Sequence, residues 1–224
     1  MLETRRIRML PTKQKFIELA IDRHALKFGT FTLKSGRVSP YFFNAGYFNR
    51  GSDLAVLGDC YADTLIDSKA EYDMLFGPAY KGIPLSCATA IALATKFSRD
   101  VPVCYNRKET KDHGEGGSLV GASLAGKVMI VDDVITAGTA IRESIDIIKA
   151  AGATPSGVLV ALDRQEMGKG SLSAIQEIVK EYKMPVYAII NLDDLHLYIQ
   201  RQPRLEGYLS AISEYRKTYG VSSA

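Results

Sequence analysis

The stretch that decides the fold is Val128-Met129-Ile130-Val131-Asp132-Asp133-Val134-Ile135-Thr136-Ala137-Gly138-Thr139-Ala140. An apolar run leads into two adjacent carboxylates, and small residues then open an amphipathic helical pattern over 139–151. A buried strand followed by a tight turn and a helix is the repeating unit of parallel α/β sheets. The sequence therefore predicts an α/β fold with this turn at the carboxyl edge of the sheet.

The rest of the chain continues the alternation. Strand patterns lie at 73–77, 101–106, 127–132, 156–163 and 185–191, and helical patterns lie at 12–27, 51–67, 82–97, 139–151, 171–182 and in the last thirty residues. This order predicts a mostly parallel, doubly wound sheet. Residues 28–48 predict short strands and a hairpin instead, and the polar, Gly-containing segment 108–126 predicts a long functional loop without regular structure.

Composition and charge exclude several classes of protein. The 224 residues are 46% hydrophobic and 24% charged, with three widely spaced cysteines and no apolar run long enough for a membrane span. We expect one cytoplasmic domain with reduced thiols. Of the net charge of +3, the first fifteen residues carry +4, so the body of the chain is close to neutral. We therefore expect neither nucleic acid nor a membrane as a partner.

The residues after the strand at 127–132 suit a phosphorylated sugar. Small side chains at 136–140 let backbone N–H groups approach an anion, and the helix that follows adds its dipole. The carboxylates of Asp132 and Asp133 repel phosphate, but they fit sugar hydroxyls, directly or through a metal. The same two acids also fit a simpler role as caps of the helix.

This segment resembles the ribose-5-phosphate motif of the type I phosphoribosyltransferases, which use phosphoribosyl pyrophosphate (PRPP). Five further motifs are similar to those of the bacterial orotate phosphoribosyltransferases, namely Phe31–Gly36, Ser39–Asn44, Phe76–Gly82, Asn106–Glu109 with Lys111–Gly114, and Leu162–Glu166. The resemblance extends over residues 14–218.

The resemblance implies the type I phosphoribosyltransferase fold, with a small hood and a flexible catalytic loop. Residues 1–11 would be an N-terminal extension and 12–224 a single domain, with a hood and base-binding segment at 12–50 and a core at 51–224. The catalytic loop, or lid, would lie at about 107–121.

The resemblance also implies the PRPP-binding residues, which are Lys34, Tyr80, Lys81, Arg107, Lys108, Lys111, His113, Asp132, Asp133, Val134, Ile135, Thr136, Ala137, Gly138, Thr139 and Ala140. Lys111, His113, Asp132 and Asp133 would be catalytic, with Mg²⁺ held mainly by PRPP and not by a protein ligand cluster. Arg107, Lys111 and His113 would act across a homodimer interface. From residues alone, Lys81 also fits a solvated loop lysine, and the charge-balanced lid also fits an ordinary surface loop.

Phe42, Phe43, Thr136 and Arg164 are implied to bind orotate. Aromatic rings can wall a flat pyrimidine, and a guanidinium matches its carboxylate with two hydrogen bonds. Without the resemblance, the two phenylalanines fit a buried strand, and Arg164 fits a salt bridge at a strand end.

The expected activity is a Mg²⁺-dependent transfer of the 5-phosphoribosyl group from PRPP to orotate, in the synthesis of pyrimidine nucleotides. Three alternatives are a phosphoribosyltransferase for another base, a PRPP-sensing regulator without catalysis, and a plain nucleotide-binding protein. The carboxylate-binding role of Arg164 favours orotate among the bases, and the cationic lid favours catalysis over sensing.

Overall fold

A computed structural model describes residues 9–33, 35–111, 117–168 and 170–221. The helices are α1 (Pro11–Asp22), α2 (Gly51–Asp67), α3 (Gly82–Phe97), α4 (Thr139–Ala150), α5 (Ala174–Tyr182), α6 (Leu192–Gln200) and α7 (Leu209–Tyr219), with short 3₁₀ turns η1 (Ala45–Tyr47) and η2 (Pro203–Tyr208). The strands are β1 (Leu26–Thr32), β2 (Val38–Phe43), β3 (Met74–Gly77), β4 (Val103–Lys111), β5 (Gly117–Gly121), β6 (Lys127–Val131), β7 (Thr154–Asp163) and β8 (Val186–Asn191).

Six strands form the central sheet in the order β5-β4-β3-β6-β7-β8. All neighbours are parallel except β4 and β5, and the register pairs Phe76 of β3 with Ile130 of β6. From β3 the chain first adds β4 on one side and later places β6 on the other. Such a reversal opens a crevice at the carboxyl ends of the two central strands, where α/β proteins bind ligands. The predicted α/β fold is confirmed.

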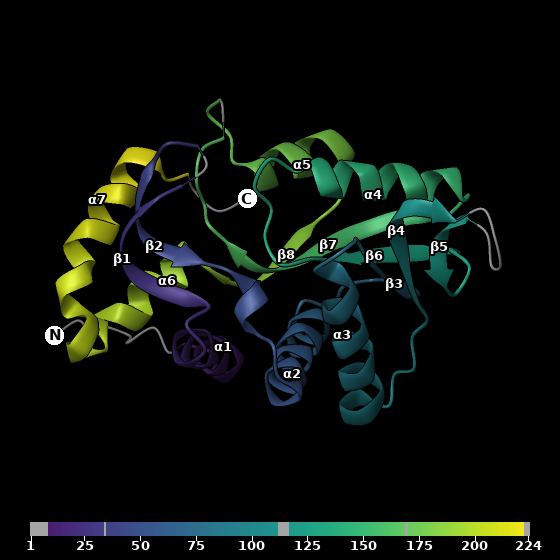
Figure 1. The fold of residues 1–224 in the computed structure, drawn as a ribbon, viewed down its shortest axis with the longest axis horizontal. Helices are drawn as coiled ribbons and strands as arrows, with labels where there is room; N and C mark the ends of the chain where they lie inside the picture. The colour runs from purple at the N-terminus through teal and green to yellow at the C-terminus, as the bar shows by residue number, and fades with distance from the viewer. Residues whose placement is uncertain (1–8, 34, 112–116, 169, 222–224) are drawn as a thin grey trace, which may run out of the picture.

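Helices cover both faces of the sheet (Figure 1). One face packs on α1, α2 and α3, and the other on α4 and α5. The alternation along β6 explains the two layers, because Met129 and Val131 join the first core cluster while Val128 and Ile130 join the second. The apolar stripe of α4, Ile141, Ile145 and Ile148, seals the second cluster.

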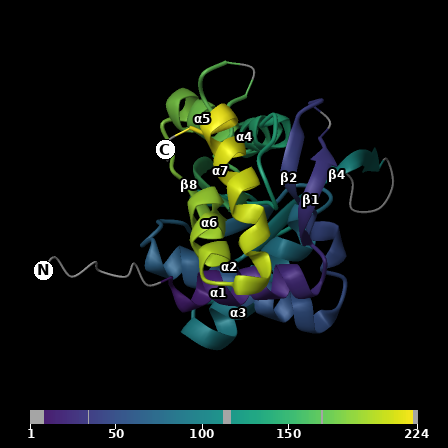
Figure 2. The same ribbon diagram turned by 90° about the vertical axis from the view of Figure 1, so that its left-hand side faces the viewer.

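The hairpin β1–β2 forms a separate two-stranded sheet, in which Leu26 pairs with Phe43. The C-terminal helix α7 lies beside it in both views (Figure 2). Ring contacts join Phe28 to Tyr208 at 5.6 Å and Tyr41 to Tyr215 at 6.3 Å between centroids. This hairpin, called the hood below, lies within the segment 12–50 that was predicted to form a hood, and ring contacts join it to the C-terminal segments.

Two local predictions were wrong. The helix predicted over 12–27 ends at Asp22, because His24 adopts a left-handed backbone (φ 57°) and Leu26 begins β1. The segment 108–126 is not a loop throughout, because β4 continues to Lys111 and β5 returns antiparallel to it, with Val120 opposite Tyr105. This ribbon lies at the sheet edge, where exposure removes the apolar alternation that marks a strand.

Within the described ranges, no helix has the length and apolar character needed to span a bilayer.

Candidate active site

The end of β6 delivers two buried carboxylates into the crevice. Asp132 is 9% exposed and Asp133 6% exposed, although both follow the last residue of the strand. Asp132 Oδ1 accepts the backbone N–H of Asp133 at 2.9 Å, and the Tyr61 hydroxyl donates to the Asp132 carbonyl at 2.8 Å. The Asp133 carbonyl accepts from Ala161 of β7 at 2.9 Å. The main chain is therefore fixed on both sides of the acidic pair.

Burial changes the acidity of one of these groups. Loss of water, reinforced by the adjacent charge of Asp133, raises the pKa of Asp132 to about 7. The hydrogen bond from the Asp133 N–H and the charge of Lys81 act in the opposite direction. Asp132 can therefore exchange a proton near neutral pH while it stays within reach of a ligand.

Small residues line the turn between Asp133 and α4. Thr136, Ala137, Thr139 and Ala140 are exposed, whereas Ile135 anchors the turn in the core. Gly138 precedes α4 with φ 74°, a conformation that side chains disfavour. The turn thus presents N–H groups and hydroxyls at a helix start, the arrangement that binds phosphate.

Lys81 reaches this acidic pair from the neighbouring strand connection. It precedes α3, and its Nζ lies 2.7 Å from Asp133 Oδ2. The Lys81 side chain is 51% exposed, so it can contact a ligand as well. The structure therefore brings together the predicted Lys81 and Asp133, whereas Tyr80 projects outward with 66% of its surface exposed.

The middle of β4 adds further cations. Asn106 Oδ1 accepts the backbone N–H of Ala79 at 2.8 Å, which ties β4 to the loop before α3. Lys108 Nζ lies 5.2 Å from the centroid of the Tyr80 ring. A cavity of about 320 Å³ opens here, lined by Pro78, Ala79, Asn106, Arg107, Lys108, Ala140, Glu143, Ser144 and Ile147. Arg107 and Lys108 thus lie at one cavity with Ala140, the last residue of the predicted phosphate turn.

Some predicted residues fall outside what the structure describes. Lys34 and His113 are not in the described ranges, and of Lys111 only the backbone, at the end of β4, is described.

Arg164 lies at the end of β7, next to the phosphate turn. An isolated bridge pairs Val134 with Leu162, so the turn runs alongside the strand that carries Arg164. The Arg164 guanidinium contacts Glu166 Oε1 at 2.9 Å through Nε and at 2.7 Å through Nη2. Its Cζ lies 4.4 Å from the centroid of the Tyr41 ring. Arg164 therefore forms the salt bridge that was one interpretation of this residue. The geometry also fits the other interpretation, carboxylate binding, because the salt bridge uses Nε and Nη2 and not Nη1.

The two phenylalanines of β2 point to opposite sides. Phe43 is 9% exposed and packs in the core against Phe16 and Phe48, with centroids 6.2 and 6.3 Å away. Phe42 is partly exposed and contacts Phe31 at 5.6 Å. Only the Phe42 ring therefore has surface to offer a flat ligand.

Several site neighbours carry no signal in the sequence analysis. Tyr61 and Tyr41 look like ordinary buried aromatics, and Ser39 and Glu166 have no assigned role although both lie in motifs used for the resemblance. Tyr41 and Glu166 are 125 residues apart and meet only in the fold. Arg164 and Glu166 are two positions apart at the end of a strand. This spacing was the one feature of the sequence indicating that their side chains point to the same side.

Mg²⁺ fits this donor set. Asp132 and Asp133 supply carboxylate oxygens at the crevice, and Mg²⁺ at phosphate sites is commonly held by one or two carboxylates plus substrate oxygens.

Known proteins with similar sequences and folds match almost the whole chain. Residues 56–184, more than half of the chain, match the family model described as "Phosphoribosyl transferase domain". The orotate phosphoribosyltransferases of Cronobacter sakazakii and Salmonella newport are 61% and 60% identical over 213 residues, which cover 95% of this chain and 100% of each relative. The crystal structure of the Francisella tularensis orotate phosphoribosyltransferase is 45% identical, with a TM-score of 0.84 over 92% of this chain and 99% of that one.

The crevice, its acidic pair and its phosphate turn thus lie in a chain that matches these enzymes over nearly its full length, and the chain belongs to the phosphoribosyltransferase family and, within it, to the orotate phosphoribosyltransferases.

Proposed function

We propose that the crevice holds PRPP and orotate side by side and transfers the 5-phosphoribosyl group to orotate, giving orotidine 5′-monophosphate and pyrophosphate. The observation that carries this assignment is the bridge between Val134 and Leu162, which sets the phosphate turn beside the strand that carries Arg164. One side of the site suits a sugar phosphate, and the other suits a planar carboxylate.

The PRPP half comprises the turn from Asp132 to Ala140 together with Lys81 and Lys108. The turn takes the 5-phosphate, and the carboxylates of Asp132 and Asp133 accept hydrogen bonds from the ribose hydroxyls. Tyr80, Lys81, Arg107 and Lys108 border the pyrophosphate, and Lys34, Lys111 and His113 complete the set. Bound Mg²⁺ would neutralise charge on the leaving group.

The orotate half comprises Arg164, Thr136 and Phe42, and Phe43 anchors the same strand in the core through Phe16. The orotate ring nitrogen loses its proton and bonds to the anomeric carbon of the ribose while the bond from that carbon to the pyrophosphate oxygen breaks. The proton leaves with pyrophosphate or passes to water. Positive charge develops on the sugar in this step, so positioning and electrostatic stabilisation account for most of the catalysis. Lys111 is the leaving-group cation, and a covalent intermediate with the protein is unnecessary.

We further propose a homodimer in which Arg107, Lys111 and His113 serve the partner's site. Support comes from the apolar character of α3, where Ile91 is 64% exposed in the middle of the helix, and from the exposed Tyr80 just before the helix. Such residues are common in subunit interfaces. We also propose that residues 12–224 act as one domain in the cytoplasm, with 1–11 as an extension.

The activity is tested by following orotate at its near-ultraviolet absorbance band with PRPP, with and without Mg²⁺. Consumption only when all three are present, with release of pyrophosphate, is expected. Failure to consume orotate, together with turnover of another base in a competition assay, would reassign the base. Failure to bind PRPP by calorimetry would remove the assignment of the phosphate turn.

The lid assignment has its own test. Lys111→Ala is expected to lower turnover far more than orotate affinity. Heterodimers that combine Lys111→Ala with a subunit inactivated at Asp133 should recover activity, because one complete site re-forms. Verified heterodimers without recovery would exclude sharing of Lys111 between subunits.

A further inference from the structure

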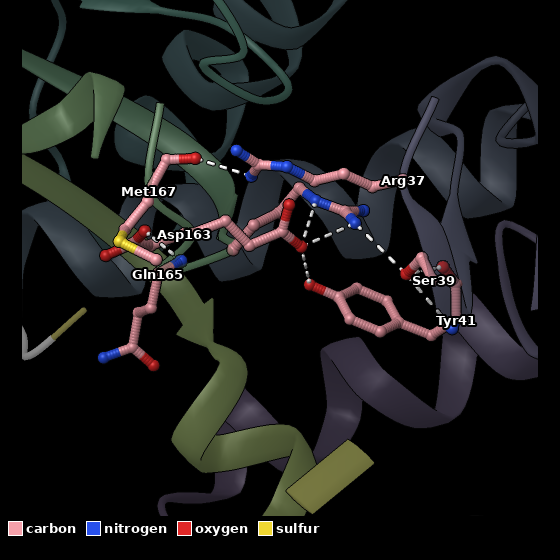
Figure 3. Close-up of polar contacts among 8 residues, drawn as sticks. Arg37, Ser39, Tyr41, Asp163, Gln165 and Met167 are labelled. Atoms are coloured by element: carbon pink, nitrogen blue, oxygen red, sulfur yellow. Dashed lines mark hydrogen bonds and ion pairs between the residues drawn. The ribbon is translucent and has the colours of Figure 1, made fainter. Parts of the chain in front are cut away.

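Residues 164–166 alternate sides as they leave β7. The Gln165 side chain points away from Tyr41 (Figure 3) and reaches α6, where its Nε2 donates to Asp193 Oδ2 at 3.2 Å and its Oε1 accepts from the Asp193 N–H at 3.0 Å. Gln165 needs this support because its φ of 49° is unusual for a residue with a side chain. The turn thereby sends Arg164 and Glu166 together toward the hood.

One carboxylate oxygen of Glu166 accepts hydrogen bonds from three donor groups. Glu166 Oε1 accepts from Nε and Nη2 of Arg164 and from the Tyr41 hydroxyl at 3.1 Å. Burial raises the pKa of Tyr41 well above its ordinary value, so the hydroxyl keeps its proton and remains a donor. Arg164 and Glu166 are 14% and 12% exposed, so water competes little for these bonds.

The face and the side edge of the Arg164 guanidinium are thus occupied. The Tyr41 ring lies against the face, Glu166 takes the edge formed by Nε and Nη2, and Nη2 is also 3.4 Å from Ser39 Oγ. The buried Tyr215 hydroxyl also lies beside this guanidinium and Glu166, and none of the hydrogen bonds named above uses Nη1. Because both hydrogens of Nη2 have acceptors in Glu166 and Ser39, Nη1 is the nitrogen that can donate to a second carboxylate.

We infer that Glu166, held in place by Tyr41, is a positioning residue that fixes Nη1 of Arg164 for the carboxylate of the base and so selects a carboxylated pyrimidine over an uncharged one. This inference rests on the proposed role of Arg164 in binding orotate. Glu166 itself does not contact the substrate. It removes the rotational freedom of Arg164, so that less ordering remains to be done when orotate binds.

The hood makes this arrangement possible. Arg37 donates to the carbonyls of Met167 at 2.6 Å and Gly168 at 3.0 Å, which joins the start of β2 to the loop after Glu166. Figure 3 shows Arg37, Ser39 and Tyr41 approaching this loop from the same side. Alternate residues of one strand therefore set both the position of the loop and the orientation of Arg164.

The experiment compares steady-state kinetics of five variants with the wild type. Glu166→Ala removes the acceptor, Glu166→Gln keeps an oxygen at the same reach, and Tyr41→Phe removes only the hydroxyl. Arg164→Ala reports whether Arg164 binds orotate at all. Glu71→Ala is the control for loss of a carboxylate, because Glu71 pairs with Lys127 at the opposite end of β6. KM and kcat for orotate, KM for PRPP, turnover with uracil and thermal midpoints are measured for each.

Glu166→Ala is expected to raise the KM for orotate about tenfold, the effect of misaligning one charge-assisted hydrogen bond. The KM for PRPP and the kcat at saturating orotate should change little, and the preference for orotate over uracil should fall. Glu166→Gln should recover most of the loss, Tyr41→Phe should give a smaller rise, and Glu71→Ala should match the wild type.

Two results overturn the inference in distinguishable ways. A large KM effect in Arg164→Ala with an unchanged or lower orotate KM in Glu166→Ala removes the positioning role and leaves the proposed function intact. Equal rises of both substrates' KM values in Glu166→Ala, with a lower thermal midpoint, reduce Glu166 to a structural residue. No effect in Arg164→Ala contradicts the proposed orotate site itself, and the role of Glu166 with it.

Discussion

Lys81 and Asp133 form an ion pair of 2.7 Å that links the start of α3 to the end of β6. Asp133 is buried, whereas half of the Lys81 side chain is exposed. The lysine therefore faces both the acidic pair and the space where an anionic ligand would lie. Its charge also lowers the pKa of Asp132, against the dominant effect of burial.

Lys81→Met is expected to reduce kcat/KM for PRPP at least about tenfold, because a charge-assisted contact to phosphate is lost. The acid limb of the pH–rate profile should also move to higher pH, since Lys81 no longer opposes the rise in the pKa of Asp132. Lys81→Arg, which keeps the charge, should leave the limb in place. A profile for Lys81→Met that overlays the wild type would disprove the coupling.

Asp132→Asn is expected to stabilise the fold at pH 8 while it impairs catalysis. The pKa of Asp132 in the fold, about 7, lies above its value of about 3.8 in an unfolded chain. The folded state therefore holds the proton more tightly, and its stability falls as the pH rises from about 4 to about 7. Asparagine keeps the oxygen that accepts the Asp133 N–H and removes the charge.

The measurement is the unfolding free energy of the wild type and Asp132→Asn at pH 5 and pH 8. The unfolding free energy of Asp132→Asn should exceed that of the wild type by more than about 1 kcal/mol at pH 8, and the difference should be smaller at pH 5. The same difference at both pH values would show that Asp132 does not titrate in this range.

Gly138→Ala is expected to weaken PRPP binding and to cost about 1 kcal/mol of stability, because its φ of 74° disfavours a side chain. Gly152→Ala is the matched control. Gly152 has φ 77° just beyond the other end of α4, and a Cβ there meets nothing within 4 Å. Both variants should lose stability through the backbone, and Gly138→Ala should lose more, because its Cβ would lie 2.7 Å from Arg142 Nη1. Calorimetry should find weaker PRPP binding only for Gly138→Ala. If Gly138→Ala and Gly152→Ala bind PRPP with equal affinity, the backbone conformation at Gly138 is not required for phosphate binding.

Phe42→Ala and Phe43→Ala should divide the functions of neighbouring positions. Phe43 packs on Phe16 and Phe48, so its truncation should cost about 3 kcal/mol of stability. Phe42 is partly exposed, so its truncation should raise the KM for orotate with a smaller loss of stability. Denaturant titrations and orotate kinetics on both variants check this, and the reverse pattern would exclude Phe42 from the base pocket.

Sequence patterns predicted the parts of the fold that bury alternating residues. The run 127–132 was predicted as a strand because it is almost continuously apolar, as suits a strand that is covered on both faces. The helix beginning at Thr139 was predicted from the helical spacing of residues such as Ile141, Ile145 and Ile148. The first part of β4 was predicted within the run 101–106, but its continuation to Lys111 and the strand β5 escaped prediction because their side chains are not sorted by burial. Hydrophobic periodicity in a sequence reflects burial, so it says little about an edge strand whose two faces are both exposed to solvent.

The site was predictable to a different extent in its two halves. Asp132 to Ala140 are contiguous, so one strand–turn–helix pattern revealed them together. The surroundings of Arg164 combine Ser39, Tyr41 and Glu166 from two distant segments, and no local pattern records which residues the fold will bring into contact. The resemblance to a family pointed to Arg164, but only the coordinates reveal what holds it.

The packing of α7 against the hood has a consequence for how the protein is made. Tyr215 and Tyr219 belong to α7, which leaves the ribosome after the other described helices, yet they contact Tyr41 and Arg37 of the hairpin. The strand and turn from Lys127 to Ala140 need neither end of the chain to find their neighbours β3 and β7. During synthesis, the surface for the sugar phosphate can thus be formed before the surface for the base, and a nascent chain becomes selective only when α7 has docked.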